Sequence, residues 1–199
     1  MTEAETYRAK MKEVQKAHRA RQGALEDPEK GLVLVHTGNG KGKSSSAFGV
    51  MVRALGWGQR VGVVQFVKGE WVTGEKQFFD KLGGVDWHRM GEGFTWDTQD
   101  KERDRKAAEA ALARARKMME SGAYDLIVLD EVNISLRYDQ VTPEAVIAAL
   151  EARDAKTGVI LTGRDAPQQI VDYADMVSVV EEVKHPYKAG IKAQRGVDF

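Results

Sequence analysis

Residues 37–44, Thr-Gly-Asn-Gly-Lys-Gly-Lys-Ser, are the stretch of sequence that decides the fold. The apolar run at 32–35 before them is short and β-branched, as in a buried strand. Between 47 and 55, apolar residues recur at three- and four-residue spacings, which predicts an amphipathic helix. A strand, a glycine-rich turn ending in Gly-Lys-Ser and a helix together indicate a phosphate-binding loop, because backbone N–H groups and a helix N-terminus both attract phosphate.

Within this loop, Lys43 is expected to reach phosphate oxygens and the hydroxyl of Ser44 is expected to bind Mg²⁺. The general pattern has glycine where this chain has Thr37, and here the first glycine comes one residue later. The loop between that glycine and Gly42-Lys43-Ser44 is therefore one residue shorter than in the general pattern. A glycine-rich turn that carries lysines by chance is the alternative. Because both flanks have the required strand and helix, we predict a polyphosphate site, with the orientation of the nucleotide left open.

The composition of the 199-residue chain fits one domain, or one domain with an appendage. The formal net charge is zero, so no overall field would attract nucleic acid or an anionic membrane. The chain has no cysteine, which excludes disulfides and thiolate metal sites. With no apolar run near the roughly 20 residues that span a bilayer, and no signal-peptide core at the N-terminus, we expect a soluble cytoplasmic protein.

Apolar runs and helical patterns alternate along the rest of the chain. Further strands are expected at 61–67, 85–89, 126–129, 159–161 and 176–183. Helices are expected within 68–83, from an N-cap at Asp97 or Thr98 to about Glu120, from an N-cap at Thr142 with Pro143 in the first turn to about Ala152, and through Ile170 and Tyr173. This alternation predicts a mostly parallel sheet of about six strands, with ligands at the carboxyl ends of the strands. Residues 1–30 are highly charged and carry only a thin apolar stripe (Tyr7, Met11, Val14 and His18). We therefore expect a helical appendage at 1–30 and a nucleotide-binding domain at 31–199.

Two carboxylates and two arginines are candidates for binding the metal ion and the phosphates. Asp130 and Glu131 follow the apolar run 126–129, and a carboxylate at the end of such a strand can face the phosphate loop and hold Mg²⁺. A strand that simply ends in solvated acids is the alternative. Arg53 and Arg164 could neutralise phosphate charge, because guanidinium donors bind phosphate in pairs. Arg164 is the better candidate because it follows a strand end, although either could be a surface arginine.

The histidines and the loop aromatics are less informative by themselves. The four histidines, at 18, 36, 88 and 185, show no spacing typical of metal ligands, so packing or surface roles are expected. The segment 90–97 places Phe94 and Trp96 in a glycine-rich loop, where side chains are presented for contact. Packing into the core or a subunit contact is the ordinary interpretation of such aromatics.

Several motifs together resemble one family, the P-loop class of ATP:corrinoid adenosyltransferases. They are TGNGKGKS at 37–44, MGEGFTW at 90–96, LDE at 129–131, TGR at 162–164 and the tail HPYKAGIKAQRGVDF at 185–199. The resemblance covers residues 31–199 nearly end to end. It implies a P-loop NTPase-like (RecA-like) α/β fold, with a mostly parallel sheet of about six strands flanked by helices and an N-terminal helical appendage. It also implies an enzyme that makes adenosylcobalamin or its precursors.

In this family a Co(I) corrinoid attacks the 5′-carbon of ATP and expels the whole triphosphate, with Mg²⁺ or Mn²⁺ as the metal. The nucleotide-binding residues implied by the resemblance are Thr37, Gly38, Asn39, Gly40, Lys41, Gly42, Lys43, Ser44, Ser45, Arg53 and Arg164. Ser44 and Glu131 would hold the metal, with Ser44 standing where the family often has threonine. Lys43, Phe94 and Trp96 would take part in catalysis.

The resemblance also implies partners. Phe94 and Trp96 would line the corrinoid pocket and remove the lower ligand of cobalt, which makes the reduction of Co(II) to Co(I) easier. An external reductase, such as a flavoprotein, would supply the electron. The protein would be a homodimer, and its N-terminal helix could fold over a corrinoid site. Cobalamin, cobinamide and cobyrinic acid a,c-diamide all remain candidate substrates, and no nucleic acid or membrane partner is expected.

Two other functions use the same loop. A P-loop ATPase or phosphotransferase would release ADP, whereas adenosyl transfer leaves inorganic triphosphate. A non-catalytic carrier of nucleotide or corrinoid would form no new cobalt–carbon bond.

Overall fold

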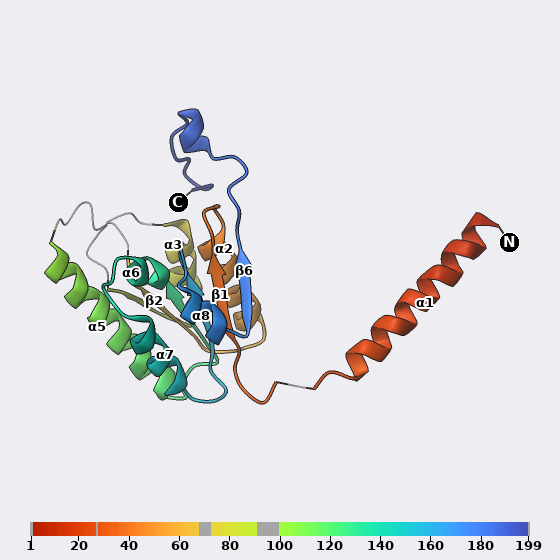
Figure 1. Cartoon of the computed structure of the whole chain (residues 1–199), viewed down its shortest axis with the longest axis horizontal. Coiled ribbons are helices and arrows are strands. Elements are labelled where there is room, and N and C mark those ends of the chain that lie inside the picture. The colour runs from red at the N-terminus through yellow and green to blue at the C-terminus, as the bar shows by residue number, and fades with distance from the viewer. Residues whose placement is uncertain (1, 27, 68–72, 91–99, 199) are drawn as a thin grey trace.

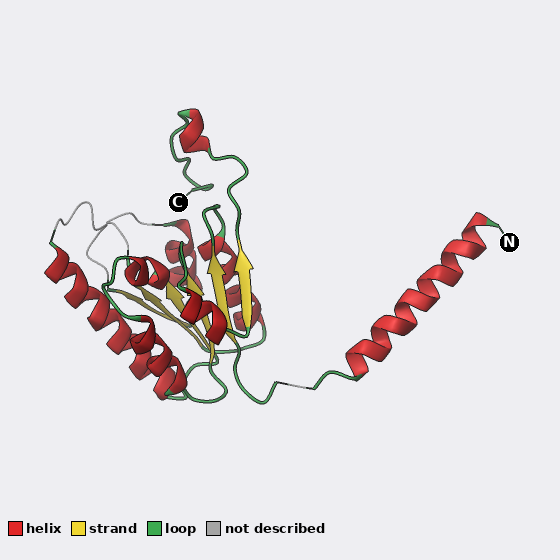
Figure 2. Ribbon diagram, viewed as in Figure 1, coloured by secondary structure: helices red, strands yellow, loops and turns green. Residues whose placement is uncertain are grey.

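The computed structural model describes residues 2–26, 28–67, 73–90 and 100–198 of the chain. Figure 1 shows a twisted sheet with helices on both faces, and Figure 2 shows the strands running side by side. The sheet has six strands in the order β3-β2-β4-β5-β1-β6, and every strand pair is parallel. The strands are β1 Val33–Thr37, β2 Val61–Gln65, β3 Val85–Arg89, β4 Leu126–Asp130, β5 Gly158–Thr162 and β6 Met176–Val179. The predicted α/β fold, with a parallel sheet of six strands flanked by helices, is confirmed.

Helix α1, Glu3–Gly23, precedes the first strand. The helices that follow the strands are those of a doubly wound sheet. They are α2 Lys43–Gly56, α3 Gly74–Leu82, α5 Lys101–Glu120, α6 Val132–Arg137, α7 Pro143–Glu151 and α8 Gln168–Tyr173, and a 3₁₀ turn η1 at Pro186–Ala189 follows the last strand. The hydroxyl of Thr142 accepts the backbone N–H of Ala145 and caps α7, as predicted, with Pro143 at its start.

A separate apolar core lies on each face of the sheet. Alternation along β4 illustrates this, because Ile127 and Leu129 belong to one core while Leu126 and Val128 belong to the other. The first core packs against α5, α6, α7 and α8, and the second packs against α2 and α3. Since both faces are covered, the central strands are apolar along nearly their whole length. The sheet is therefore a rigid base for the loops at its edge.

The strand register brings the candidate site residues to one edge. β5 lies between β1 and β4, with His36 beside Thr162 and Leu129 beside Leu161. Because all strands run in the same direction, the phosphate loop after β1, the carboxylates at the end of β4 and the turn after β5 all emerge at the carboxyl edge.

Some predicted boundaries were wrong. Helix α5 is capped by Asp100, whose carboxylate accepts the N–H of Arg103, and not by Asp97 or Thr98, which lie outside the described residues. The last strand ends at Val179 rather than at residue 183, because the chain beyond it turns to contact the phosphate loop. The short helix α6 was not predicted, since six residues are too few for a helical pattern to be recognised.

Helix α1 stands apart from the rest of the chain in Figures 1 and 2. Thr2 and Glu5 form a reciprocal capping box at its start, and none of its residues is buried. In the part of the chain that the structure describes, α1 included, no helix has the length and apolar character needed to cross a bilayer. The division into an appendage at 1–30 and a domain at 31–199 stays a prediction.

Candidate functional site

The loop between β1 and α2 has the backbone shape of a phosphate cradle. Gly38 and Gly42 have φ angles of 97° and 118°, a region that side chains other than glycine rarely adopt. Gly42 directly precedes the first residue of α2, so the helix N-terminus faces the loop. Gly40 allows a close approach, because a Cβ there would lie 2.5 Å from the carbonyl oxygen of Glu181. The loop predicted from the glycine pattern is therefore present.

Lys43 is held inside this loop. Its side chain is buried (7% exposed), and its Nζ atom donates a hydrogen bond to the carbonyl oxygen of Gly40 at 2.6 Å. Burial lowers the pKa of Lys43; the negative charge of Glu131 opposes this shift, while the positive charges of Arg164 and Lys41 add to it. A phosphate chain in the loop would supply the counter-charge that Lys43 needs.

His36 contacts the residues that begin helix α2, directly after the phosphate loop. It is buried near the end of β1, and its Nδ1 atom lies 2.7 Å from the hydroxyl of Ser46, which donates to the carbonyl of Lys43 at 3.0 Å. The same Nδ1 atom lies 3.4 Å from the carbonyl oxygen of Lys43, so His36 and Ser46 both contact the backbone at the start of α2. A packing or surface role was predicted for His36, and in the structure its side chain packs against the residues that begin α2, next to the phosphate loop.

Acid is expected to destabilise the protein through His36. Burial lowers the pKa of His36 below 6.5, and the hydrogen bond to the Lys43 carbonyl only partly opposes this shift. Below pH 6.5 the unfolded chain therefore gains a proton at this residue before the folded chain does, and the free energy of unfolding falls as pH falls. The melting temperature from pH 8 to pH 5 should decrease less in His36→Gln than in the wild type. The pKa of His88 is also lowered by burial, so some dependence remains in the variant. Identical pH dependence in the two proteins would contradict this role.

The two carboxylates at the end of β4 have different environments. Asp130 is only 2% exposed, and its oxygens accept hydrogen bonds from the Gln65 amide at 2.8 Å and the Thr162 hydroxyl at 2.9 Å. Glu131 is half-buried and has a φ angle of 61°, which turns the chain out of the strand. A Cβ on Gly163 would lie 3.2 Å from Oε2 of Glu131, so this carboxylate reaches the turn after β5. Asp130 therefore joins the ends of neighbouring strands, while Glu131 reaches the turn after β5, and its negative charge acts to raise the pKa of Lys43 in the loop.

The turn after β5 is tied to the same edge. The backbone N–H of Gly163 donates to the carbonyl of His36, and the Asn133 amide donates to the carbonyl of Gly163 at 3.2 Å. Arg164 follows and is exposed. Asn133 was not predicted, because no local pattern marks a polar side chain in the first turn of a six-residue helix.

A cavity of about 590 Å³ opens beside the loop. Its lining includes Gly38 and Asn39 from the phosphate loop and Arg164 from the turn after β5. Its other wall is formed by residues 179–182 and Lys188, from the end of β6 and the tail. The structure thus brings Arg164 and the loop to one cavity, as predicted. The contribution of the tail to this cavity was not predicted, because no local sequence pattern marks the residues after β6 as neighbours of the phosphate loop.

Some predicted residues are not brought together. Arg53 is exposed in the last turn of α2, about 15 Å from Lys43 along the helix at 1.5 Å per residue, so the fold does not bring it to the loop. Ser44 and Ser45, in contrast, lie beside the loop in the first turn of α2, where Ser44 is half-buried and Ser45 is exposed. Phe94 and Trp96 lie outside the described residues.

No group of three or more histidine, aspartate or glutamate side chains that could hold a metal occurs within residues 2–26, 28–67, 73–90 and 100–198.

A family model described as "ATP:corrinoid adenosyltransferase BtuR/CobO/CobP" matches residues 29–199. The chain belongs to the ATP:corrinoid adenosyltransferase family. It is 51% identical to a corrinoid adenosyltransferase of Pseudomonas aeruginosa over 172 residues, which cover 86% of this chain and 85% of that protein. It is 42% identical to the corrinoid adenosyltransferase CobA of Salmonella typhimurium over 195 residues, which cover 98% of each chain. Among solved structures, the flagellar accessory protein FlaH of Methanocaldococcus jannaschii superimposes with a TM-score of 0.49 at 17% identity, over 76% of this chain and 71% of that one.

Membership of the adenosyltransferase family confirms the enzyme class and the transfer of an adenosyl group to a corrinoid that the sequence motifs predicted. The roles of the individual site residues stay predictions.

Proposed function

We propose that this adenosyltransferase holds the triphosphate of ATP in the loop 37–44 while the cobalt of a Co(I) corrinoid attacks the 5′-carbon. The observation that carries the proposal is the buried Lys43, which lies inside a glycine cradle next to the helix N-terminus and close to Glu131 and Arg164. The site thus combines donors for a phosphate chain with a carboxylate suited to its metal. The product would serve the biosynthesis or salvage of adenosylcobalamin.

The proposed step breaks one bond and forms one. An electron pair of Co(I) forms the cobalt–carbon bond. The bond between the 5′-carbon and its oxygen breaks, and triphosphate leaves with the electron pair of that carbon–oxygen bond. Cobalt ends formally as Co(III). Negative charge grows on the departing oxygen, so donors fixed around the triphosphate stabilise the transition state more than the ground state. We assign this work to Lys43, Lys41 and Arg164, with the backbone N–H groups of the loop.

The residues near the loop fit a magnesium ion. Ser44 offers a hydroxyl and Glu131 a carboxylate, and Mg²⁺ prefers such oxygen ligands together with phosphate oxygens and water. When bound, the metal would neutralise charge on the leaving triphosphate. In this proposal Ser44 and Glu131 orient the metal–nucleotide complex, and the Thr162 hydroxyl, which accepts the backbone N–H of Glu131 at 2.9 Å, fixes the position of the carboxylate.

Phe94 and Trp96 are proposed to face the corrinoid and to exclude the lower ligand of cobalt. Replacing Trp96 with alanine should then slow the reduction of Co(II) corrinoid in the site more than it slows turnover of Co(I) corrinoid reduced beforehand. Stopped-flow absorption with each starting oxidation state measures both rates. Trp57→Ala is the matched control, because Trp57 is exposed at the end of α2, in the segment before β2. Equal losses in the two assays would contradict the role.

Helix α1 is proposed to dock over a corrinoid site in a homodimer, and an external reductase is proposed as the electron donor. The helix carries Tyr7 and Val14 at exposures of 65% and 54%, and it has no buried residue of its own. An apolar stripe of this kind gains stability when a second surface covers it. The cytoplasm is the proposed location of the reaction.

The formation of a cobalt–carbon bond tests the proposed function. The purified protein is incubated with Mg-ATP and chemically reduced Co(I) cobalamin, and the absorption spectrum of the corrinoid is followed. We expect the spectrum of an alkylated, light-sensitive cobalamin to appear, and light should reverse the change. A carrier without chemistry would leave the spectrum of bound but unalkylated corrinoid, which would contradict the proposal.

A further inference from the structure

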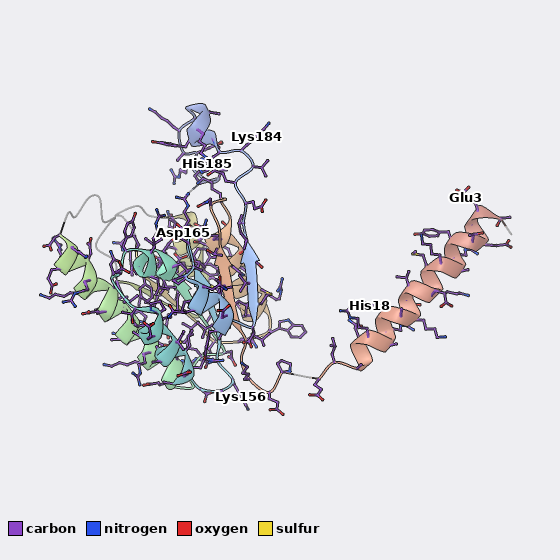
Figure 3. The ribbon with its side chains drawn as sticks, in the orientation of Figure 1. Glu3, His18, Lys156, Asp165, Lys184 and His185 are labelled. Atoms are coloured by element: carbon purple, nitrogen blue, oxygen red, sulfur yellow. The ribbon has the colours of Figure 1, made fainter. Side chains whose placement is uncertain are left out.

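The C-terminal tail is tied to the phosphate loop by an ion pair. Nζ of Lys41 lies 2.5 Å from Oδ1 of Asp198, at the far end of the tail that follows β6. Figure 1 shows the tail above the carboxyl edge of the sheet, and Figure 3 places Lys184 and His185 there, on the same side as Asp165. A second ion pair, between Lys188 and Glu182, holds the tail to the segment after β6.

Hydrogen bonds within the tail hold Asp198 in place. Its Oδ2 atom accepts the backbone N–H of Gln194 at 2.8 Å, and its own N–H donates to the carbonyl of Gln194 at 2.8 Å. The ammonium of Lys41 and then the N–H of Gln194 lower the pKa of Asp198, so the carboxylate is charged at neutral pH. A fixed negative charge therefore contacts a lysine of the loop proposed to bind phosphate.

We propose that Asp198 competes with the triphosphate chain for Lys41. The inference rests on the proposed function, because it takes Lys41 as a phosphate ligand. A carboxylate that contacts Lys41 would lie close to any phosphate that contacts the same ammonium, and like charges at such distances repel. Binding of triphosphate therefore separates Asp198 from Lys41. Because such coupling is reciprocal, the Lys41–Asp198 ion pair weakens the binding of triphosphate by the same free energy by which triphosphate weakens the ion pair. Asp198 would thus lower the affinity of the loop for triphosphate, which is the product that must leave.

The competition predicts a specific pattern in a double-mutant cycle. Binding of inorganic triphosphate with Mg²⁺ is measured by calorimetry for the wild type, Asp198→Asn, Lys41→Met and the double variant. Asp198→Asn should bind about two- to fivefold more tightly than the wild type, the range expected for release of a partly exposed ion pair. In the Lys41→Met background the same substitution should change the affinity little. Asp80→Asn is the charge-matched control, since Asp80 pairs with Lys76 on α3, and it should bind like the wild type.

Amide hydrogen exchange gives a second, independent result. In the wild type, Mg-triphosphate should speed exchange at the backbone N–H of Gln194, because the turn that Asp198 closes loses its anchor to Lys41 and opens more often. An equal gain in affinity with and without Lys41 would show a general charge effect and overturn the competition, as would slower exchange in the tail. Triphosphate binding by the wild type with no effect of Asp198→Asn would overturn the competition alone. No triphosphate binding by the wild type would overturn the proposed phosphate site as well.

Discussion

Replacing Lys43 with alanine is expected to weaken the binding of Mg-ATP about 10- to 150-fold. The substitution removes a charge-assisted hydrogen bond to phosphate, which contributes about 1.5–3 kcal/mol. The structure places the ammonium inside the loop, where it bonds to the carbonyl of Gly40 and is shielded from water. Turnover should fall at least as much, because the same charge would stabilise the leaving triphosphate. Calorimetry with Mg-ATP and the initial rate of cobalamin alkylation measure the two effects.

Lys156→Ala is the matched control for this substitution. Lys156 is an exposed lysine at the edge of the sheet opposite the loop (Figure 3), so its removal changes the net charge equally and leaves the site intact. Thermal melting of both variants separates a binding effect from a loss of folding. If Lys43→Ala folds and binds Mg-ATP with wild-type affinity, the assignment of the phosphate loop is wrong.

Replacing Glu131 with glutamine is expected to raise the Mg²⁺ concentration needed for half-maximal turnover by about 10- to 100-fold, the loss typical when a metal site is perturbed. Glutamine keeps the size of the side chain and the backbone N–H that donates to Thr162. What it removes is the negative charge that a hard cation prefers. Turnover is measured at saturating ATP over a range of Mg²⁺ concentrations.

Glu151→Gln serves as the control for Glu131, because Glu151 is exposed at the end of α7. Its dependence on Mg²⁺ should match that of the wild type. A Glu131→Gln variant with an unchanged Mg²⁺ requirement would exclude Glu131 from the metal site.

The features that were predictable from the sequence are local ones. The glycines at 38, 40 and 42, the preceding apolar strand and the following helix are encoded within about 25 consecutive residues, so a pattern could find them. Glu131 and Arg164 could also be selected, because parallel strands bring their carboxyl ends to one edge whatever the details of packing. The corrinoid substrate was predicted from the family motifs, because the phosphate loop alone does not specify it.

The features that could not be predicted depend on contacts between distant segments. The Thr162–Asp130 hydrogen bond links two strands, and the Lys41–Asp198 pair joins residues 157 positions apart. No spacing rule indicates either contact. Arg53 shows the converse, since it is near Lys43 in sequence while ten residues of helix α2 separate the two side chains. Its contact with the nucleotide stays a prediction.

The phosphate products of the reaction test the central claim most directly. The protein is incubated with Mg-ATP and Co(I) cobalamin until the cobalt–carbon bond has formed, and the mixture is analysed by phosphorus NMR. If the loop holds the triphosphate while cobalt attacks the 5′-carbon, one inorganic triphosphate appears for each alkylated corrinoid. ADP and phosphate as the main products would show that the loop serves phosphoryl transfer, and would contradict a triphosphate held there while cobalt attacks the 5′-carbon.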